Sequence, residues 1–134
     1  MRRLSPILAL LLTLAACNEA EPPQDVGVCW RVTQNADKSL RYAPLARGVD
    51  DLDTCAVLLE GLRLRGEQGT DGAYQGYFIF VNPQTISSAR HVDGFRYPIF
   101  QPPQRAAVDR DLRRLMQSHG GQLPGPGEIT LDKQ

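Results

Sequence analysis

Hydrophobic and polar residues alternate in several short stretches of the chain and recur at helical spacing in two longer ones. Val28, Trp30 and Val32 share one face of the first extended stretch, as in a strand with one buried face. The predicted strands are 26–33, 40–43, 74–81, 85–91 and 95–100, and the predicted helices are 49–65 and 104–119. We expect 74–81 to be a central strand because it is the most hydrophobic of these stretches. The last stretch should lie at a sheet edge because it contains Pro98.

The helix predicted at 49–65 carries signals at both ends. Asp50 can cap its first turn, and Gly66 follows its last one. Its apolar residues recur at intervals of three and four and define one inward face: Leu52, Cys55, Ala56, Leu59 and Leu62. The second helix also has an apolar face, and its arginines form a stripe that we expect to face solvent: Arg105, Arg110, Arg113 and Arg114.

Two halves of the chain show the same order of elements. Residues 28–65 and 77–119 both read strand, strand, helix. Each half contains an Arg-Tyr pair ahead of a proline, Arg41-Tyr42 in one and Arg96-Tyr97 in the other. We therefore predict an α+β fold, a two-layer sandwich in which an antiparallel sheet of about four strands carries two helices on one face, in ββα-ββα order. Duplication and chance similarity both stay open as the origin of this pattern.

The N-terminal segment has the parts of a secretory signal. Arg2 and Arg3 precede an apolar run, 7–14, that is too short to span a bilayer, and two alanines follow it. Because a cysteine comes next, Leu14-Ala15-Ala16-Cys17 resembles the lipobox of bacterial lipoproteins. The resemblance implies removal of 1–16, acylation of Cys17 with palmitate among its chains, and an anchor on the periplasmic side of the inner or the outer membrane. The alternative is a plain secretory signal, which would leave the protein free in the periplasm.

The remaining length fits one domain. Without its first 16 residues the chain of 134 keeps enough residues for a modest core. We divide the chain into a signal peptide (1–16), a lipidated cysteine with its tether (17–25), an α+β domain (26–121) and a flexible tail (122–134). The proline-containing, acidic tether would reach about 25 to 30 Å if fully extended.

The three cysteines sharpen the prediction of the compartment. With Cys17 assigned to lipid, Cys29 and Cys55 remain as a pair, and an oxidising compartment favours a disulfide between them. Two unpaired thiols or half of a metal site are the alternatives. Neither cysteine belongs to a C-x-x-C motif, and His91 and His119 lack ligand-like spacing, so we predict no metal ion.

Charge and motifs exclude several functions. The net charge is zero for the whole chain and about −2 without the signal, which argues against nucleic acid as a partner. Ser87, Ser88, His91 and Asp93 have no nucleophile elbow around them, so we predict no catalytic residue, no cofactor and no enzymatic activity.

Aromatic and arginine residues on the predicted strands are the better candidates for function. If the helices cover one face of the sheet, part of the aromatic set must lie on the other face, where it can bind a partner. The candidate binding surface comprises Trp30, Tyr42, Tyr77, Tyr97, Arg31, Arg41 and Arg96. The sequence therefore predicts a non-catalytic binding or accessory module of the cell envelope, with an envelope protein or a cell-wall component as partner. A periplasmic enzyme or enzyme inhibitor of an unrecognised family is the alternative.

Overall fold

The computed structural model of the chain describes residues 21–131. The predicted signal peptide and Cys17 lie outside this range, so lipidation stays a prediction. No helix within the range is long and apolar enough to cross a membrane. The strands are β1 (Val28–Gln34), β2 (Leu40–Arg47), β3 (Gly72–Tyr74), β4 (Tyr77–Val81), β5 (Ile86–Ala89) and β6 (Tyr97–Pro98). The helices are α1 (Leu52–Leu64), α2 (Pro102–Ser118) and the 3-10 helix η1 (Pro126–Glu128).

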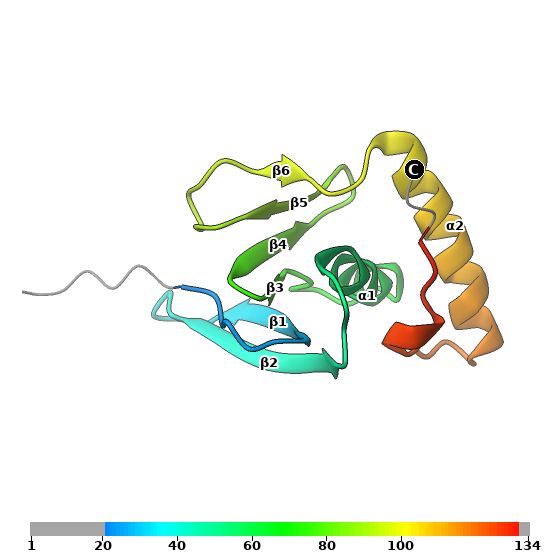
Figure 1. Ribbon diagram of the computed structural model, residues 1–134, viewed down its shortest axis with the longest axis horizontal. Helices are drawn as coiled ribbons and strands as arrows, with labels where there is room; N and C mark the ends of the chain where they lie inside the picture. The colour runs from blue at the N-terminus through cyan, green and yellow to red at the C-terminus, as the bar shows by residue number, and fades with distance from the viewer. Residues whose placement is uncertain (1–20, 132–134) are drawn as a thin grey trace, which may run out of the picture.

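The strands described in residues 21–131 form one antiparallel sheet of six, in the order β2-β1-β3-β4-β5-β6 (Figure 1). The α+β class and the antiparallel pairing are as predicted, but the sheet is larger than the expected four strands or so. One reason is that the expected strand 74–81 is two strands joined by a tight hairpin. Gln75 and Gly76 have φ angles of 41° and 84°, the left-handed conformation that a two-residue turn requires. At the sheet's edge, β6 contains Pro98, as predicted.

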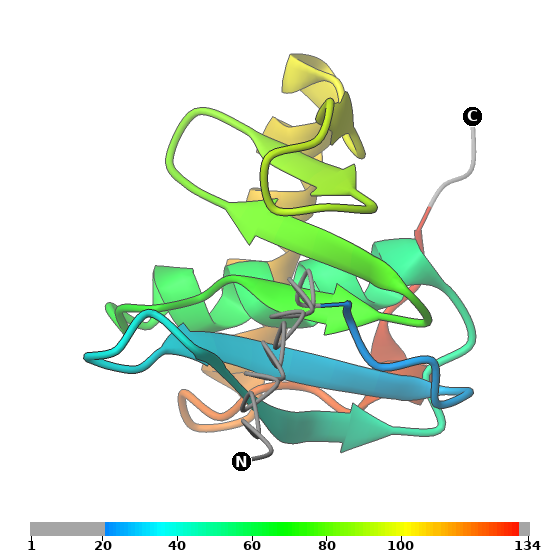
Figure 2. The same cartoon turned by 90° about the vertical axis from the view of Figure 1, so that its left-hand side faces the viewer.

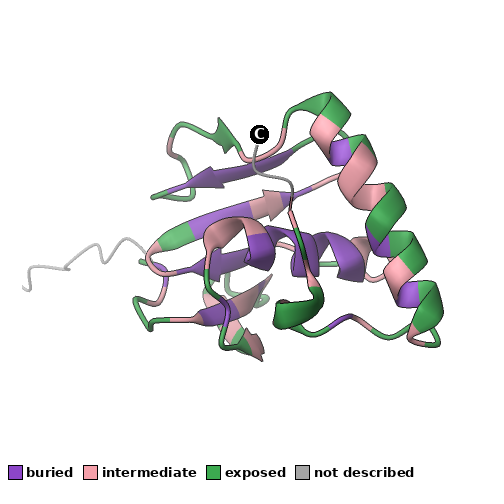
Figure 3. Cartoon of the chain, turned by 45° about the vertical axis from the view of Figure 1, so that its right-hand side comes forward, coloured by how far each residue is buried: buried purple, intermediate pink, exposed green. Residues whose placement is uncertain are grey.

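The two helices do not lie side by side on the sheet. Helix α1 packs on β1, β3 and β4, and α2 packs on α1 (Figure 1). The domain therefore has three layers, sheet, α1 and α2, which corrects the predicted two-layer arrangement. The reason is that α1 is buried almost all round (Figure 3): Val57, outside the predicted inward face, packs against Leu112 and Met116 of α2.

A disulfide joins the sheet to α1. Cys29 of β1 and Cys55 of α1 are bonded, with 5.3 Å between their Cα atoms, and both are fully buried. The predicted pairing is confirmed. The packing of sheet on helix is close elsewhere too, since a Cβ atom at Gly72 of β3 would overlap the side chain of Leu59 and the carbonyl oxygen of Trp30.

The C-terminal segment that we expected to be flexible packs on the domain as far as residue 131. Leu123, Ile129 and Leu131 contact the apolar seam between α1 and α2. The Nε2 atom of His119 lies 2.9 Å from the Oε1 atom of Glu128 and ties the end of α2 to η1. The apolar residues of this segment stabilise it by burial, which its proline and glycine content does not reveal.

Part of the expected tether also lies on the domain. Pro22 is buried, and the carbonyl oxygen of Pro23 accepts a hydrogen bond of 2.9 Å from the backbone N–H of Gly76. The Tyr42 hydroxyl donates to the carbonyl oxygen of Glu21 at 3.5 Å. Residues 21–25, within the predicted tether, thus contact β2 and the turn between β3 and β4.

Candidate binding surface

The register of the strands divides the candidate residues between the two sides of the sheet. We call the side that packs on α1 the helix side and the other the open side. Residues paired across adjacent strands share a side, because side chains alternate along each strand. Trp30 pairs with Ala73, and Ala73 pairs with Phe78. The neighbouring residue Cys29 is bonded to α1 and therefore lies on the helix side. The row that contains Trp30 lies on the open side. Tyr42 pairs with Val32 and so lies on the open side too.

Arg96 also belongs to the open side. Its guanidinium lies 3.7 Å from the ring centroid of Phe80, a residue that alternates with the helix-side residue Ile79. A cation at this distance over an aromatic face is attracted by the ring quadrupole. Arg96 therefore stacks on the sheet and is held by it.

Arg31 and Arg41 lie on the helix side. The Arg31 guanidinium donates from Nε to the carbonyl oxygen of Gly69 at 2.9 Å and pairs with Glu67 at 3.0 Å, so it fastens the loop after α1 to the sheet. Arg41 pairs with Thr33 at the β2 edge. These contacts make Arg31 a structural residue rather than part of an open recognition surface.

Tyr77 and Tyr97 lie on the helix side as well, although we expected the candidate aromatics on the opposite face. Tyr97 pairs with Ser88, and Ser88 pairs with Ile79, two residues from Tyr77. Both tyrosines remain exposed, at 36% and 63%, and neighbouring Phe95 is 75% exposed. The sheet extends here beyond the strands on which α1 mainly packs.

The exposed rings take part in two separate contacts, one between Phe95 and Tyr97 and one between Tyr77 and Arg90. The ring centroids of Phe95 and Tyr97 are 4.8 Å apart in an edge-on arrangement. The Arg90 guanidinium lies 5.1 Å from the centroid of Tyr77 and donates to its hydroxyl oxygen at 3.0 Å. We call Tyr77, Arg90, Phe95 and Tyr97 the aromatic corner. The contacts order its side chains before any partner arrives.

A hollow of about 190 Å³ adjoins the aromatic corner. It is lined by Leu52, Tyr74, Gln75, Tyr77 and Ser88, so Tyr77 belongs to both features. The Tyr74 hydroxyl donates to the carbonyl oxygen of Val49 at 2.7 Å. Burial, with smaller contributions from Asp51 and Asp50, raises the pKa of Tyr74 above its ordinary value of 10.0, at which the hydroxyl is already neutral at physiological pH. The hollow therefore has an uncharged floor suited to an apolar or hydroxyl-bearing group.

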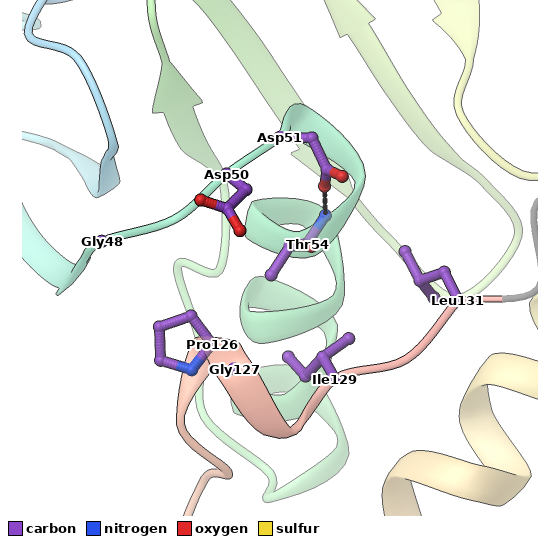
Figure 4. Close-up of a pocket in the computed structure, with 8 residues that line it drawn as sticks. All are labelled: Gly48, Asp50, Asp51, Thr54, Pro126, Gly127, Ile129 and Leu131. Atoms are coloured by element: carbon purple, nitrogen blue, oxygen red, sulfur yellow. Dashed lines mark hydrogen bonds between the residues drawn. The ribbon is translucent and has the colours of Figure 1, made fainter.

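A second pocket, of about 210 Å³, lies where the C-terminal segment meets the start of α1 (Figure 4). Its lining includes two adjacent carboxylates, Asp50 and Asp51. Asp51 is the N-cap, since its Oδ1 atom accepts a 2.8 Å hydrogen bond from the backbone N–H of Thr54, whereas we expected Asp50 in this role. Capping and the positive end of the helix dipole account for these acids without a ligand.

A buried ion cluster joins α1 to α2, and the sequence did not reveal it. Glu60 is fully buried and accepts hydrogen bonds from Nη2 of Arg63 at 2.6 Å and from Nη2 of Arg105 at 3.0 Å. Asp109 lies 3.9 Å from Arg105 and 4.0 Å from Arg63. Arg105 is therefore buried, which corrects its place in the predicted solvent-facing stripe.

The pKa values of the two carboxyl groups in this cluster are shifted in opposite directions. Burial alone would raise the pKa of Glu60, but the hydrogen bonds from Arg63 and Arg105 outweigh it and lower that pKa. Burial, and then the neighbouring Glu60 carboxylate, raise the pKa of Asp109 to about 6. Neighbouring carboxyl groups with oppositely shifted pKa values are common in active sites and in structural ion clusters. This cluster is enclosed between two helices, so we assign it to the packing of α2 on α1.

Metal ligands and known relatives give no further assignment. Within residues 21–131, no group of three or more His, Cys, Asp or Glu side chains is placed to hold a metal ion. The chain matches no protein-family profile, and it has no significant match among curated proteins or solved structures.

Proposed function

We propose that the protein is a membrane-tethered, non-catalytic binding module on the periplasmic side of a bacterial membrane, and that it captures a protein partner through the aromatic corner. The observation that carries this proposal is the grouping of three exposed rings and a stacked arginine beside a hollow of about 190 Å³. Large aromatic residues exposed together on a small domain are typical of an interaction site.

The chemistry of the aromatic corner favours a protein partner. Tyrosine and arginine are enriched among the residues that contribute most to protein binding, and apolar anchors of a partner commonly fill adjacent pockets. The contacts of Phe95 with Tyr97, and of Arg90 with Tyr77, restrict these side chains in advance. Binding therefore costs less side-chain entropy than it would for free rotamers.

Two features support the compartment. The buried disulfide between Cys29 and Cys55 is of the kind that persists in oxidising compartments and is rare in the cytosol. The lipobox-like segment that ends at Cys17 is the basis for the tether. Mass spectrometry of the protein purified from membranes tests this part of the proposal. The N-terminal peptide should begin at Cys17 and carry acyl chains, and an unmodified Cys17 would contradict the tether.

Site-specific photo-crosslinking in intact envelopes tests the binding surface. A photoreactive side chain at position 97 should form an adduct with a defined protein, and the same group at position 114, exposed on α2, should not. With the partner purified, Tyr97→Ala and Phe95→Ala should each weaken binding by about tenfold, or 1.4 kcal/mol. Arg114→Ala is the matched control and should leave the affinity unchanged. Equal crosslinking at both positions, or an adduct with glycan strands in place of a protein, would refute the proposed partner class.

A further inference from the structure

The hollow beside the aromatic corner shares a wall with the contact made by the N-terminal part of the described chain. We call residues 21–27 the entry segment, because they lead into β1. In Figure 2 this is the dark blue stretch that starts in front of the sheet and runs to the beginning of β1. The entry segment contacts the turn between β3 and β4, which consists of Gln75 and Gly76. Since Gln75 also lines the hollow, this turn belongs both to the entry segment's contact and to the binding site.

Two hydrogen bonds hold the entry segment on this turn. The Oε1 atom of Gln75 accepts from the backbone N–H of Gly27 at 2.9 Å. The backbone N–H of Gly76 donates to the carbonyl oxygen of Pro23, also at 2.9 Å. A Cβ atom at Gly76 would lie 2.7 Å from the side-chain amide of Gln24, so the missing side chain of this glycine makes room for the segment.

Gln75 has a backbone conformation that glutamine seldom adopts. Its φ angle is 41°, in the left-handed region that favours glycine and asparagine in a two-residue turn. Other residues stay in this region only where the surrounding contacts hold them, and they are concentrated at ligand-binding and switch regions. The hydrogen bond with Gly27 is such a contact, because it fixes the Gln75 side chain. Release of the entry segment would therefore free a side chain that forms a wall of the hollow.

A second chain of hydrogen bonds connects the entry segment to Tyr74. The carbonyl oxygen of Gly27 accepts from the backbone N–H of Val49 at 3.0 Å. The carbonyl oxygen of Val49 in turn accepts from the Tyr74 hydroxyl at 2.7 Å. Tyr74 is buried and lines the hollow. Gly27 is thus joined to two of the lining residues, directly to Gln75 and through Val49 to Tyr74.

We propose that the entry segment regulates the binding hollow: its docking on the turn between β3 and β4 and the capture of the protein partner are coupled, and each favours the other. This inference rests on the proposed function of the aromatic corner. With the segment docked, Gln75 and Tyr74 are ordered in advance, so binding does not have to immobilise them. Because such coupling is reciprocal, a partner in the hollow in turn holds the segment on the turn. The part of the chain that leads to the proposed tether is then also the part that controls the site.

Fluorine NMR of the four tyrosines tests this coupling without a partner. The protein is expressed from its full sequence with 3-fluorotyrosine, and replacement of each tyrosine by phenylalanine in turn assigns the resonances. Tyr42 reports on the entry segment, because its hydroxyl donates to the carbonyl oxygen of Glu21. Tyr74 and Tyr77 report on the hollow that they line. Tyr97, on β6, is the internal control.

Pro22→Asp should release the entry segment, and Val26→Asp is the matched control. Pro22 is buried, so a carboxylate there opposes docking, whereas the Val26 side chain is 86% exposed and can take the same charge without a change in contacts. In Pro22→Asp the resonances of Tyr42 and of the two tyrosines of the hollow should move, and that of Tyr97 should stay. Unmoved resonances from the hollow, a shift of Tyr97 as well, or the same shifts in Val26→Asp would overturn the inference. Circular dichroism checks the fold, and Pro22→Gly with Val26→Gly replaces this pair if Pro22→Asp does not fold.

The affinity for the purified partner separates the two proposals. Pro22→Asp should weaken binding by about threefold to tenfold, the cost of ordering one long side chain again, and Val26→Asp should leave the affinity unchanged. An unchanged affinity in Pro22→Asp would overturn the coupling and leave the proposed function intact. If crosslinking at position 97 captures no protein, the proposed function fails, and the fluorine spectra still decide whether the entry segment controls the hollow.

Discussion

Replacement of Arg105 by methionine should destabilise the fold strongly, because it removes a cation from the buried ion cluster and leaves the Glu60 carboxylate buried. Arg105 donates to both carboxylate oxygens of Glu60, at 3.0 and 3.1 Å, and Glu60 is fully buried. The variant leaves Glu60 with Arg63 as its remaining cation and with Asp109 as a neighbouring acid. Loss of one partner of a buried ion pair typically costs about 3 to 5 kcal/mol. That is a large part of the total stability of a domain of this size, about 5 to 15 kcal/mol.

Urea denaturation at pH 7, followed by circular dichroism and by Trp30 fluorescence, measures this effect. The midpoint should fall while the slope stays that of the wild type, as expected for a change in stability alone. Arg114→Met is the matched control, since its guanidinium is exposed and lies 4.0 Å from Asp111. An exposed pair of this kind contributes about 1 kcal/mol at most. A loss below about 1 kcal/mol in Arg105→Met would show that Glu60 does not depend on this cation and would refute the argument.

The same cluster should give the protein its highest stability in mildly acidic solution. The folded state raises the pKa of Asp109 from 3.8 to about 6, so the stability that this group contributes is full below pH 4 and is lost as the pH rises through 6. This loss is at most about 3 kcal/mol. Glu60 has a lowered pKa, so its contribution is present above its ordinary value of 4.5 and is lost on acidification. Denaturation midpoints should therefore be highest near pH 4.5 and decline as the pH rises through 6, and Asp109→Asn should remove this decline.

Further predictions concern the contact between sheet and α1. Cys29→Ser combined with Cys55→Ser should lower the unfolding free energy by about 3.5 kcal/mol, the chain-entropy estimate for a separation of 26 residues, and an unchanged denaturation midpoint would contradict it. Gly72→Ala should destabilise by about 1 to 3 kcal/mol or more, because the added methyl group overlaps Leu59 and backbone. Gly127→Ala, where nothing lies within 4 Å of the new methyl group, is its control, and equal thermal midpoints for the two variants would refute the packing argument.

Patterns that the sequence shows directly, in the spacing or the number of residues of one kind, could be predicted. The three- and four-residue spacing of apolar side chains located α1, and the cysteine count located the disulfide. Pro98 marked an edge strand because proline lacks the N–H that an inner strand needs. Two residues of the aromatic corner, Tyr77 and Tyr97, were among the candidate residues. Arg90 was not, because its contact with Tyr77 joins β4 to the residue that follows β5.

The sequence by itself determined the α+β class, the main elements and the residues that alternate along each strand. Only the tertiary structure decided which side of the sheet is covered, because alternation shows which residues share a side and not what packs on it. It also decided that α1 is buried on two faces and that Glu60 meets Arg105 across 45 positions of sequence. A helix pattern predicts one inward stripe, whereas burial on a second face depends on where a distant helix docks. That docking placed α2 on α1, away from the sheet.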